Sequence, residues 1–320
     1  MGRFDFEGFA RGWFVACFSD ELAPGDVKPL RYFDQDLVLF RTASGAPKIL
    51  DAFCPHMGAH LGHGGTVKGE SIECPFHAWQ FDGAGQCTDI PYAKKIPPRA
   101  KVECWPIVEK NGMVYVWHDP DKAAPTWQIP DLAWWGSPDW TGWTYGQLEV
   151  KTHPREIVEN VVDVGHFIPV HGTHVGDISN VFDGHTAKQI NSGTAYPIGG
   201  GKDDYSLEAT YYGPGYQVTD MHGVLHSHLI NAHTPIDEGT LLLRFAVAVK
   251  RADADKYGDG FVDTYIENLR GGFFQDIAIW EHMTFRDRPV LCDGDGPLIK
   301  LRKWYAQFYA PAAPAEGAPA

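Results

Sequence analysis

The alternation of apolar and polar positions divides the chain into a first part with short strands only and a second part that mixes strands with helices. In the first part, apolar runs bounded by Asp, Gln, Ser and Gly predict the strands. These runs are 12–18, 37–41, 48–53 and 113–117. Short strands joined by tight turns predict an all-β domain over residues 1–118.

The second part begins with an irregular stretch, because residues 119–142 hold four prolines and four tryptophans and predict a packed linker. Strand patterns follow at 148–151, 206–212, 218–220, 223–232 and 241–250. Helical spacing occurs at 157–171, where Gly165 and Pro169 interrupt it, and again at 263–281. We therefore expect the α+β class, with an α+β domain over 143–310 and a disordered Pro/Ala-rich tail over 311–320.

Composition narrows the functional classes. The net charge of −14 argues against a nucleic-acid partner, whose phosphates would repel the protein. No apolar run has the length of a membrane span, and the first 20 residues lack a signal-peptide pattern. Four of the six cysteines, Cys17, Cys87, Cys104 and Cys292, follow no disulfide spacing and are expected to be buried thiols. We expect a cytoplasmic protein.

Two short loops of similar composition carry cysteine and histidine together. Cys54 and His56 form a C-x-H pair, and Cys74 and His77 form a C-x-x-H pair after 17 intervening residues. A Rieske [2Fe–2S] cluster needs two thiolates on one iron and two imidazoles on the other. These four residues are the predicted cluster ligands.

A structural zinc site is the alternative interpretation, because zinc also binds two thiolates and two imidazoles. Zinc sites more often use C-x-x-C pairs, so the mixed order favours the cluster. His60 and His63 fall outside the two-loop pattern and are interpreted as surface or neighbouring histidines. Neither loop carries a further cysteine, which points away from the high-potential respiratory Rieske proteins and toward those that serve oxygenases.

A second group of candidate ligands lies in the C-terminal domain. His166 and His171 are five residues apart, which on a regular helix separates their side chains by about 140°. A helix break at Pro169 would let both reach one metal. Asp276 lies among apolar and aromatic residues and is the predicted third ligand. Two histidines and a carboxylate with open positions are typical of non-haem Fe(II), although each residue alone is more often structural.

The cluster loops and the pattern N-x-x-D-x-x-H-x4-H over 160–171 resemble the oxygenase component of Rieske non-haem iron oxygenases. Further stretches are similar to one branch, the 3-ketosteroid 9α-hydroxylase oxygenases and the related cholesterol 7-desaturases. These stretches are 74–79, 156–163, 209–214, 275–280, 295–297 and 302–309. The resemblance implies a Rieske domain followed by a helix-grip (START-like) domain, in which an antiparallel sheet wraps over a helix.

The resemblance also implies roles for individual residues. The implied [2Fe–2S] ligands are Cys54, His56, Cys74 and His77, and the implied ligands of a mononuclear non-haem Fe(II) are His166, His171 and Asp276. Asp163 matches the carboxylate that links a cluster histidine of one subunit to an iron-ligating histidine of the next in a head-to-tail homotrimer. The implied electron donor is an NADH-dependent reductase with flavin and its own iron–sulfur centre, acting directly or through a ferredoxin.

The implied reaction is O2-dependent hydroxylation of an apolar steroid, with 3-ketosteroid 9α-hydroxylation favoured. Strands at 206–212, 221–232 and 241–248 are candidates to line the cavity. Arg244 is their one cationic residue, which favours a neutral substrate over a carboxylate. The basic residues Lys94, Lys95, Arg99 and Lys101 form either a docking patch for an acidic electron donor or an ordinary solvated loop.

Three other functions stay open. A sterol 7-desaturase would begin with the same hydrogen abstraction as a hydroxylase, and an aromatic demethylase would use the same metal centres. The chain starts without the membrane segment of animal desaturases, which favours a soluble bacterial hydroxylase. A Rieske electron carrier would need no second domain, and iron content separates it from an oxygenase.

Overall fold

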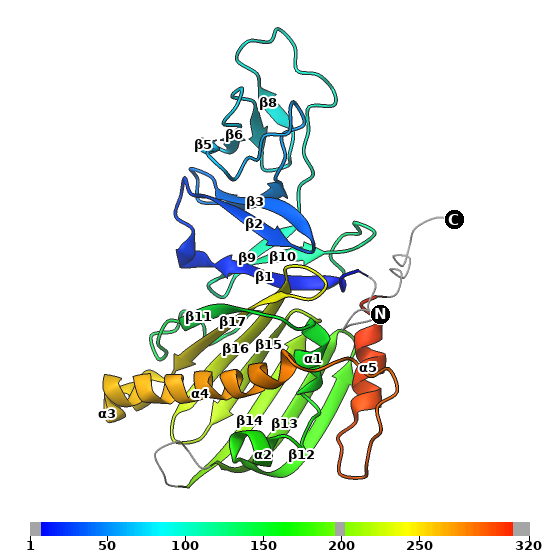
Figure 1. Ribbon diagram of the computed structural model, residues 1–320. Helices are drawn as coiled ribbons and strands as arrows, with labels where there is room; N and C mark the ends of the chain where they lie inside the picture. Colours follow the sequence, from blue (N-terminus) through cyan, green and yellow to red (C-terminus); the bar gives the residue numbers. More distant parts are fainter. Residues whose placement is uncertain (1–7, 196–201, 310–320) are drawn as a thin grey trace. The chain divides into compact units, whose positions relative to one another are not determined.

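The computed structural model describes residues 8–195 and 202–309, and the chain divides into two compact units (Figure 1). One unit runs from Phe14 to His118. The other comprises the described residues before Phe14 and those from Asp119 onward. The predicted tail at 311–320 lies outside the described residues, and the predicted domain boundaries stay a prediction.

The unit from Phe14 to His118 is built from three small sheets with strand orders β1-β10-β9, β2-β3-β4 and β5-β6-β7-β8. The strands are β1 (Gly12–Phe18), β2 (Val27–Tyr32), β3 (Gln35–Arg41), β4 (Pro47–Asp51), β5 (Thr66–Lys68), β6 (Ser71–Glu73), β7 (Gln80–Asp82), β8 (Cys87–Asp89), β9 (Ile107–Lys110) and β10 (Met113–His118). A short 3-10 helix, Ser19–Glu21, follows β1. β1 and β10 are buried along their whole length, which explains their continuous apolar sequences.

The other unit is built on a seven-stranded antiparallel sheet with the order β11-β17-β16-β15-β14-β13-β12. The strands are β11 (Thr144–Val150), β12 (His174–Asp183), β13 (Thr186–Ala195), β14 (Asp203–Tyr212), β15 (Tyr216–His222), β16 (His226–Pro235) and β17 (Leu241–Val249). Strands β12 to β17 pair in sequence order, and β11 joins the far edge beside β17.

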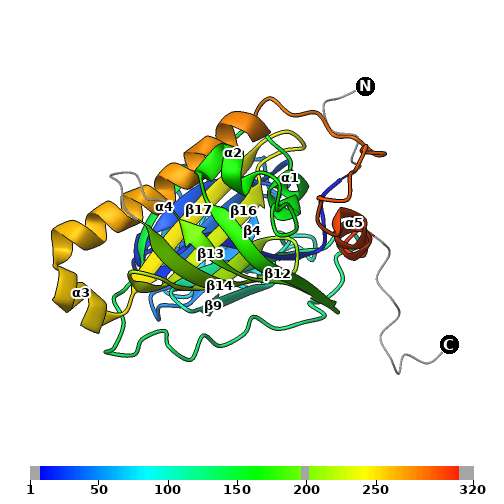
Figure 2. The same ribbon diagram turned by 90° about the horizontal axis from the view of Figure 1, so that it is seen from below.

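One long helix crosses this sheet, and Figure 2 shows it on the same face as two short helices. The helices are α1 (Pro154–Glu159), α2 (Phe167–His171), α3 (Arg251–Tyr257), α4 (Asp259–Trp280) and α5 (Leu298–Ala306). Ile266 of α4 packs against Leu229 and Val247 of the sheet. Because strand side chains alternate between faces, the odd-numbered residues of β16 and β17 face α4 and the even-numbered ones face away.

The structure confirms the predicted α+β class, with an all-β N-terminal part and a sheet covered by a helix. Among the elements that the apolar pattern missed are β2, β12, β13 and α5; β12 and β13 escaped it because they carry many polar residues. The expectation of four buried thiols is wrong for Cys104 and Cys292, which are exposed. Within the described ranges, no helix combines the length and apolarity needed to cross a bilayer.

Candidate metal centres

The two cysteine–histidine loops have the same backbone arrangement. The carbonyl oxygen of Cys54 accepts a hydrogen bond from Gly58 N at 2.9 Å, and that of Cys74 accepts one from Ala78 N at 3.1 Å. The residue four places after each cysteine has a positive φ, 76° at Gly58 and 57° at Ala78. The two loops are therefore structural repeats, and each presents its ligands from the same kind of turn.

The four predicted cluster ligands come together between these loops. Cys54 and Cys74 are buried, and the thiol of Cys54 interacts with that of Cys74. Burial, together with the neighbouring Cys74 and against the His56 backbone hydrogen bond, raises the pKa of Cys54 to about 11. The rings of His56 and His77 lie 4.5 Å apart between centroids. Thiols beside thiols and imidazoles beside imidazoles suit a cluster with one pair on each iron.

The surroundings of the His56 ring test whether the four donors fit a Rieske cluster. Its Nδ1 is buried and has no hydrogen-bond partner among the described residues, so a lone pair is left for a metal. The ring stacks on Trp79 at 4.7 Å between centroids, and Trp79 Nε1–H donates to Tyr92 Oη at 2.8 Å. The tryptophan therefore holds the imidazole in place, and the donor set fits a Rieske cluster.

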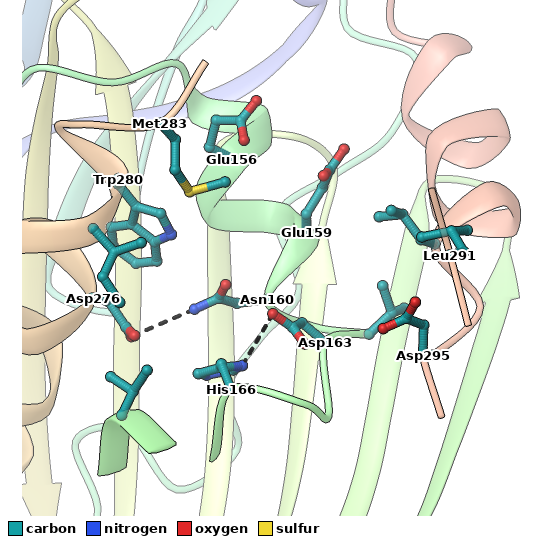
Figure 3. Close-up of a pocket in the computed structure, with 15 residues that line it drawn as sticks. Glu156, Glu159, Asn160, Asp163, His166, Asp276, Trp280, Met283, Leu291 and Asp295 are labelled. Carbon is teal, nitrogen blue, oxygen red and sulfur yellow. Dashed lines mark hydrogen bonds and ion pairs between the residues drawn. The ribbon is translucent and has the colours of Figure 1, made fainter. Parts of the chain in front are cut away.

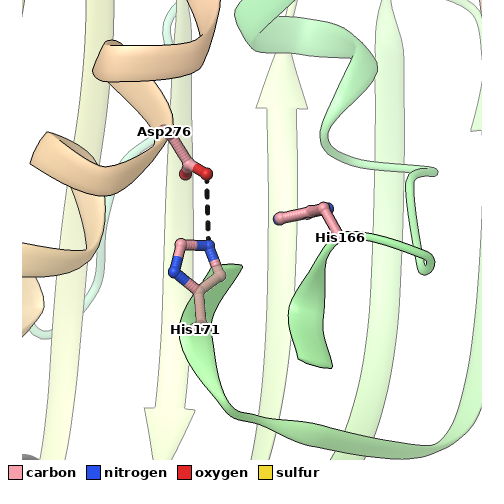
Figure 4. Close-up of side chains that lie close together, drawn as sticks. All are labelled: His166, His171 and Asp276. Atoms are coloured by element: carbon pink, nitrogen blue, oxygen red, sulfur yellow. Dashed lines mark ion pairs between the residues drawn. The ribbon is translucent and has the colours of Figure 1, made fainter. Parts of the chain in front are cut away.

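The second predicted group also comes together, although not through the expected helix break. His166 precedes α2 and His171 is the last residue of α2, so they lie at opposite ends of one short helix. The prediction that Pro169 breaks the helix is wrong, because Pro169 lies in the first turn, where its missing N–H needs no partner. Figure 4 shows Asp276 of α4 pointing toward His171, with His166 nearby.

Distances support one metal at this place. His171 Nε2 lies 3.2 Å from Asp276 Oδ1, and one ligand atom from each of the three residues falls within 4.8 Å of the others. The side chains of His166, His171 and Asp276 are 15%, 18% and 12% exposed. Two imidazoles and one carboxylate in a half-closed site fit non-haem Fe(II) with open coordination positions.

Both histidines direct Nδ1 away from the metal position. His171 Nδ1–H donates to Gln275 Oε1 at 3.0 Å, and His166 Nδ1 lies 3.3 Å from Asp163 Oδ2. Burial lowers the pKa of His171, but Asp276 and then Gln275 raise it by more, and the net pKa is raised. The Gln275 acceptor at Nδ1 fixes the tautomer of His171 in which Nε2 carries the lone pair for a metal. His166 Nδ1 faces the Asp163 carboxylate without a hydrogen bond among the described residues.

Asp163 and Asn160 complete the site from the segment after α1. Asn160 Nδ2–H donates to Asp276 Oδ2 at 3.4 Å, which leaves Asp276 Oδ1 toward the histidines. Asp163 is half-exposed, and the adjacent His166 imidazole holds its pKa below the usual range. Figure 3 shows Asp163 beside His166 and Asn160 beside Asp276. Asn160 and Gln275 were not assigned roles from the sequence, although both lie in motifs that carried the resemblance.

A pocket opens beside Asp276, His166 and Asp163, lined by α1, α2, α4 and residues 291–298 (Figure 3). Two contacts restrict the conformation of the pocket wall. Arg302 of α5 donates to both carboxylate oxygens of Glu159 at 2.7 and 3.0 Å. At Gly296 an added Cβ would lie 1.8 Å from the Val162 carbonyl oxygen, so only glycine fits. The three strands predicted to line a substrate cavity contribute no residue here, and their role stays a prediction.

Comparison with known proteins agrees with this geometry. Residues 12–106 match the Rieske [2Fe-2S] domain, and residues 116–309 match the 3-ketosteroid 9α-hydroxylase C-terminal domain. An oxygenase component of 3-ketosteroid-9-alpha-monooxygenase from Rhodococcus rhodochrous is 38% identical over 95% of this chain and 84% of its own length. Cholesterol 7-desaturase from Ciona intestinalis is 31% identical over 96% of this chain and 70% of its own length.

Solved structures show the same fold. Dicamba monooxygenase bound to dicamba superposes with a TM-score of 0.78 at 19% identity, covering 94% of this chain and 98% of that one. A second structure of that enzyme, with non-haem iron and dicamba, has a TM-score of 0.69 at 20% identity over the same shares. The Rieske match confirms the predicted cluster.

Proposed function

The chain belongs to the Rieske monooxygenases whose C-terminal domain is of the 3-ketosteroid 9α-hydroxylase type, and we propose that it is the terminal oxygenase of a steroid-hydroxylating system. The observation that carries this proposal is the group formed by His166, His171 and Asp276, in which His171 Nδ1 is hydrogen-bonded to Gln275 and His166 Nδ1 faces Asp163. Hydroxylation of a 3-ketosteroid at the 9α position is the favoured reaction.

We assign the ligands as follows. Cys54, His56, Cys74 and His77 would hold the [2Fe–2S] cluster, and His166, His171 and Asp276 the mononuclear iron. Bound there, the iron would supply activation of O2 for attack on a substrate C–H bond, with electrons delivered one at a time from the cluster. The protein's own task is to position these groups, exclude water and hold the substrate.

Three side chains would perform this positioning. Gln275 accepts the Nδ1 proton of His171, and Asp163 faces Nδ1 of His166, so neither ring can turn. Asn160 holds the second oxygen of Asp276. Partners of this kind typically change metal affinity or activity by about 10- to 100-fold when removed.

Asp163 is also the proposed contact between subunits. Its side chain is 47% exposed while one oxygen faces an iron-ligating histidine, which suits a group that meets a cluster histidine of a neighbouring subunit. We therefore propose a head-to-tail homotrimer, reduced by an NADH-dependent flavin and iron–sulfur reductase either directly or through a ferredoxin. The residues from Pro91 to Arg99 are all exposed, so the basic stretch is available for such a donor and its docking role stays a prediction, as does the cytoplasmic location.

The sheet face under α4 supports a largely apolar substrate with few polar groups. Gln189, Asn191 and Asn231 are buried and carry amide atoms without a hydrogen-bond partner among the described residues. By strand register they share the face of Phe245, which packs on Phe273 of α4. Buried amides left unpaired are costly, and ketone oxygens of a steroid would satisfy the N–H donors of Gln189 and Asn191, whereas Asn231 Oδ1 needs a donor.

The position of Arg244 also favours a neutral substrate. It is even-numbered on β17, so it lies on the face away from α4, whereas a substrate near Asp276 would lie on the α4 face. The one cation considered as a partner for a substrate carboxylate is therefore not available to it. This favours a neutral steroid over the benzoates and ethers of aromatic demethylases.

The sterol 7-desaturase is the second candidate, because a relative of that name is 31% identical over most of this chain. The electron carrier is disfavoured by the second unit and its ligand group.

The test is turnover with a surrogate Rieske reductase and NADH on 3-ketosteroids, 3β-hydroxysterols and methoxybenzoates, read by mass spectrometry. Gain of one oxygen on a 3-ketosteroid is expected. Loss of two hydrogens from a sterol would establish the desaturase instead, and reaction of methoxybenzoates alone would overturn the steroid assignment.

A further inference from the structure

A second histidine-rich group lies on the β15–β16 hairpin, outside the centres described above. Its members are Asp220, His222, His226 and His228. In the strand register Asp220 pairs with His228 and His222 pairs with His226. Residues two apart on a strand share a face, so all four side chains lie on one face of the hairpin.

This face is the one turned away from α4. The neighbouring residues Met221 and Ser227 both contact Tyr265 of α4, which fixes the odd-numbered residues on the α4 side. The group therefore lies on the opposite face of the sheet from Asp276 and is separate from the proposed iron site.

One carboxylate oxygen is the common centre of the group. Asp220 Oδ1 lies 2.8 Å from His226 Nε2, 3.5 Å from His222 Nε2 and 3.6 Å from His228 Nδ1. One ligand atom from each of Asp220, His226 and His228 falls within 4.8 Å of the others. In a tetrahedral zinc site with bonds of about 2.0–2.1 Å, neighbouring ligand atoms are about 3.3–3.4 Å apart. The nitrogens of His222 and His228 lie close to that distance from Asp220 Oδ1, whereas His226 Nε2 is hydrogen-bonded to it.

A buried nitrogen of His228 is a second, independent indication that this group binds an ion. Its side chain is 8% exposed, and its Nδ1 is a buried atom with no hydrogen-bond partner among the described residues. This nitrogen faces the carboxylate of Asp220, and an unpaired buried polar atom of this kind is costly unless something binds it.

Tryptophans hold this arrangement from the segment at 119–142. Trp134 stacks on His228 with centroids 4.0 Å apart and an interplanar angle of 8°, and Trp140 lies 4.3 Å from His228 and 4.8 Å from His226. Rigid rings around nitrogen donors lower the entropy cost of metal binding.

We propose that Asp220, His226 and His228 bind a divalent metal ion of the zinc class. Imidazole and carboxylate donors suit Zn2+ and its neighbours rather than Mg2+ or Ca2+, which take oxygen ligands. Three protein ligands leave the fourth tetrahedral position to water. The ion would join β15 to β16 and, through the stacked tryptophans, fix residues 134–140 against the sheet.

The experiment is equilibrium dialysis of the iron-loaded full-length protein against Zn2+, with zinc and iron measured in the same sample. The variant Asp220→Asn/His226→Gln removes two ligands and leaves buried His228 in place. The matched control is His282→Ala, which removes an exposed imidazole outside the group. We expect the wild type and the control to gain one zinc per chain with unchanged iron, and the double variant to gain none.

Thermal unfolding provides the second measurement. Bound zinc should raise the melting temperature of the wild type by roughly 5 °C at about 100 times Kd, because the ion binds only the folded state, and should leave the double variant unchanged. No zinc uptake by the wild type, equal uptake by wild type and double variant, or uptake matched by loss of iron would each overturn the proposal.

Discussion

The cluster loops repeat one local arrangement twice, whereas the second centre collects its ligands from segments far apart in the chain. In the loops, Gly58 and Ala78 occupy equivalent left-handed positions and close equivalent hydrogen bonds. In the second centre, His171 is held by Gln275, 104 residues away, and Asp276 by Asn160, 116 residues away. The first centre therefore depends on turn geometry, and the second depends on how α4 packs beside α1 and α2.

This difference indicates which structural change would disrupt each centre. A local loop keeps its shape as long as its own backbone hydrogen bonds form. A centre assembled from α2 and α4 is lost whenever α4 shifts, because among the described residues no backbone hydrogen bond joins these two helices. Ligand changes should consequently affect the two centres separately.

The largest expected effect comes from removing one ligand from each centre in turn. His171→Ala should lose the mononuclear iron, about a third of the iron per chain, while the cluster absorbance remains. Cys74→Ser should lose the cluster absorbance. Turnover should fall in both by more than about 100-fold, beyond the range for partners of ligands. Iron analysis with visible spectra is the measurement, and a full iron content in His171→Ala would remove that residue from the ligand set.

The next effect should come from Asp163, which links the two kinds of centre in our proposal. Asp163→Asn keeps the size but loses the charge facing His166, so turnover should fall by about 100-fold with both metal centres filled. Asp295→Asn is the matched control, because Asp295 lines the same pocket and accepts a hydrogen bond from Cys292 N rather than contacting a histidine. Equal activity of the two variants, with normal iron, would argue against the bridging role.

The same contrast explains what the sequence could predict. The C-x-H and C-x-x-H spacing places four donors in two turns, so the four cluster ligands could be predicted from the sequence alone. The second group gave a weaker signal, because nothing local connects Asp276 to His166; the apolar surroundings of Asp276 suggested it and the family resemblance supported it. The roles of Asn160 and Gln275 were missed because they arise only when helices pack.

The pattern of apolar residues predicted the inner strands because nearly all of their residues are buried. β16 and β17 bury nearly every residue and show long apolar runs, whereas the edge strand β12 and its neighbour β13 are more polar. The group at Asp220 did leave a signal, histidines and an acid at alternate positions of two paired strands. Its meaning depended on the register that pairs Asp220 with His228.

Acid should weaken the sheet unit through its buried histidines. Burial lowers the pKa of His233 to about 4, although the Pro214 carbonyl opposes this, and His153 and Tyr211 are its titratable neighbours. The unfolded chain takes up the proton near pH 6.5, so stability is full above that pH and falls as pH drops toward 4. The loss between pH 7 and 5 should be about 2 kcal/mol for this residue.

Urea unfolding at pH 7 and pH 5 measures this loss. His233→Gln keeps an N–H donor for the Pro214 carbonyl but does not titrate, so its stability should fall less between the two pH values than that of the wild type. His282→Gln, at an exposed position, should keep the wild-type slope. An unchanged slope in His233→Gln would show that protonation elsewhere controls acid stability.

The smallest effect should test whether the two cluster loops are true repeats. Ala78 has φ 57°, where an alanine costs about 1–2 kcal/mol, and Gly58 has φ 76° with open space around its missing Cβ. Ala78→Gly should therefore stabilise the protein by about 0.5–1 kcal/mol, after the entropy cost of glycine. Gly58→Ala should destabilise it by a similar amount with the cluster retained, because the strain is conformational and no atom blocks the methyl group. Denaturant unfolding followed by cluster absorbance measures both changes, and effects of the same sign would mean that the loops do not carry equivalent strain.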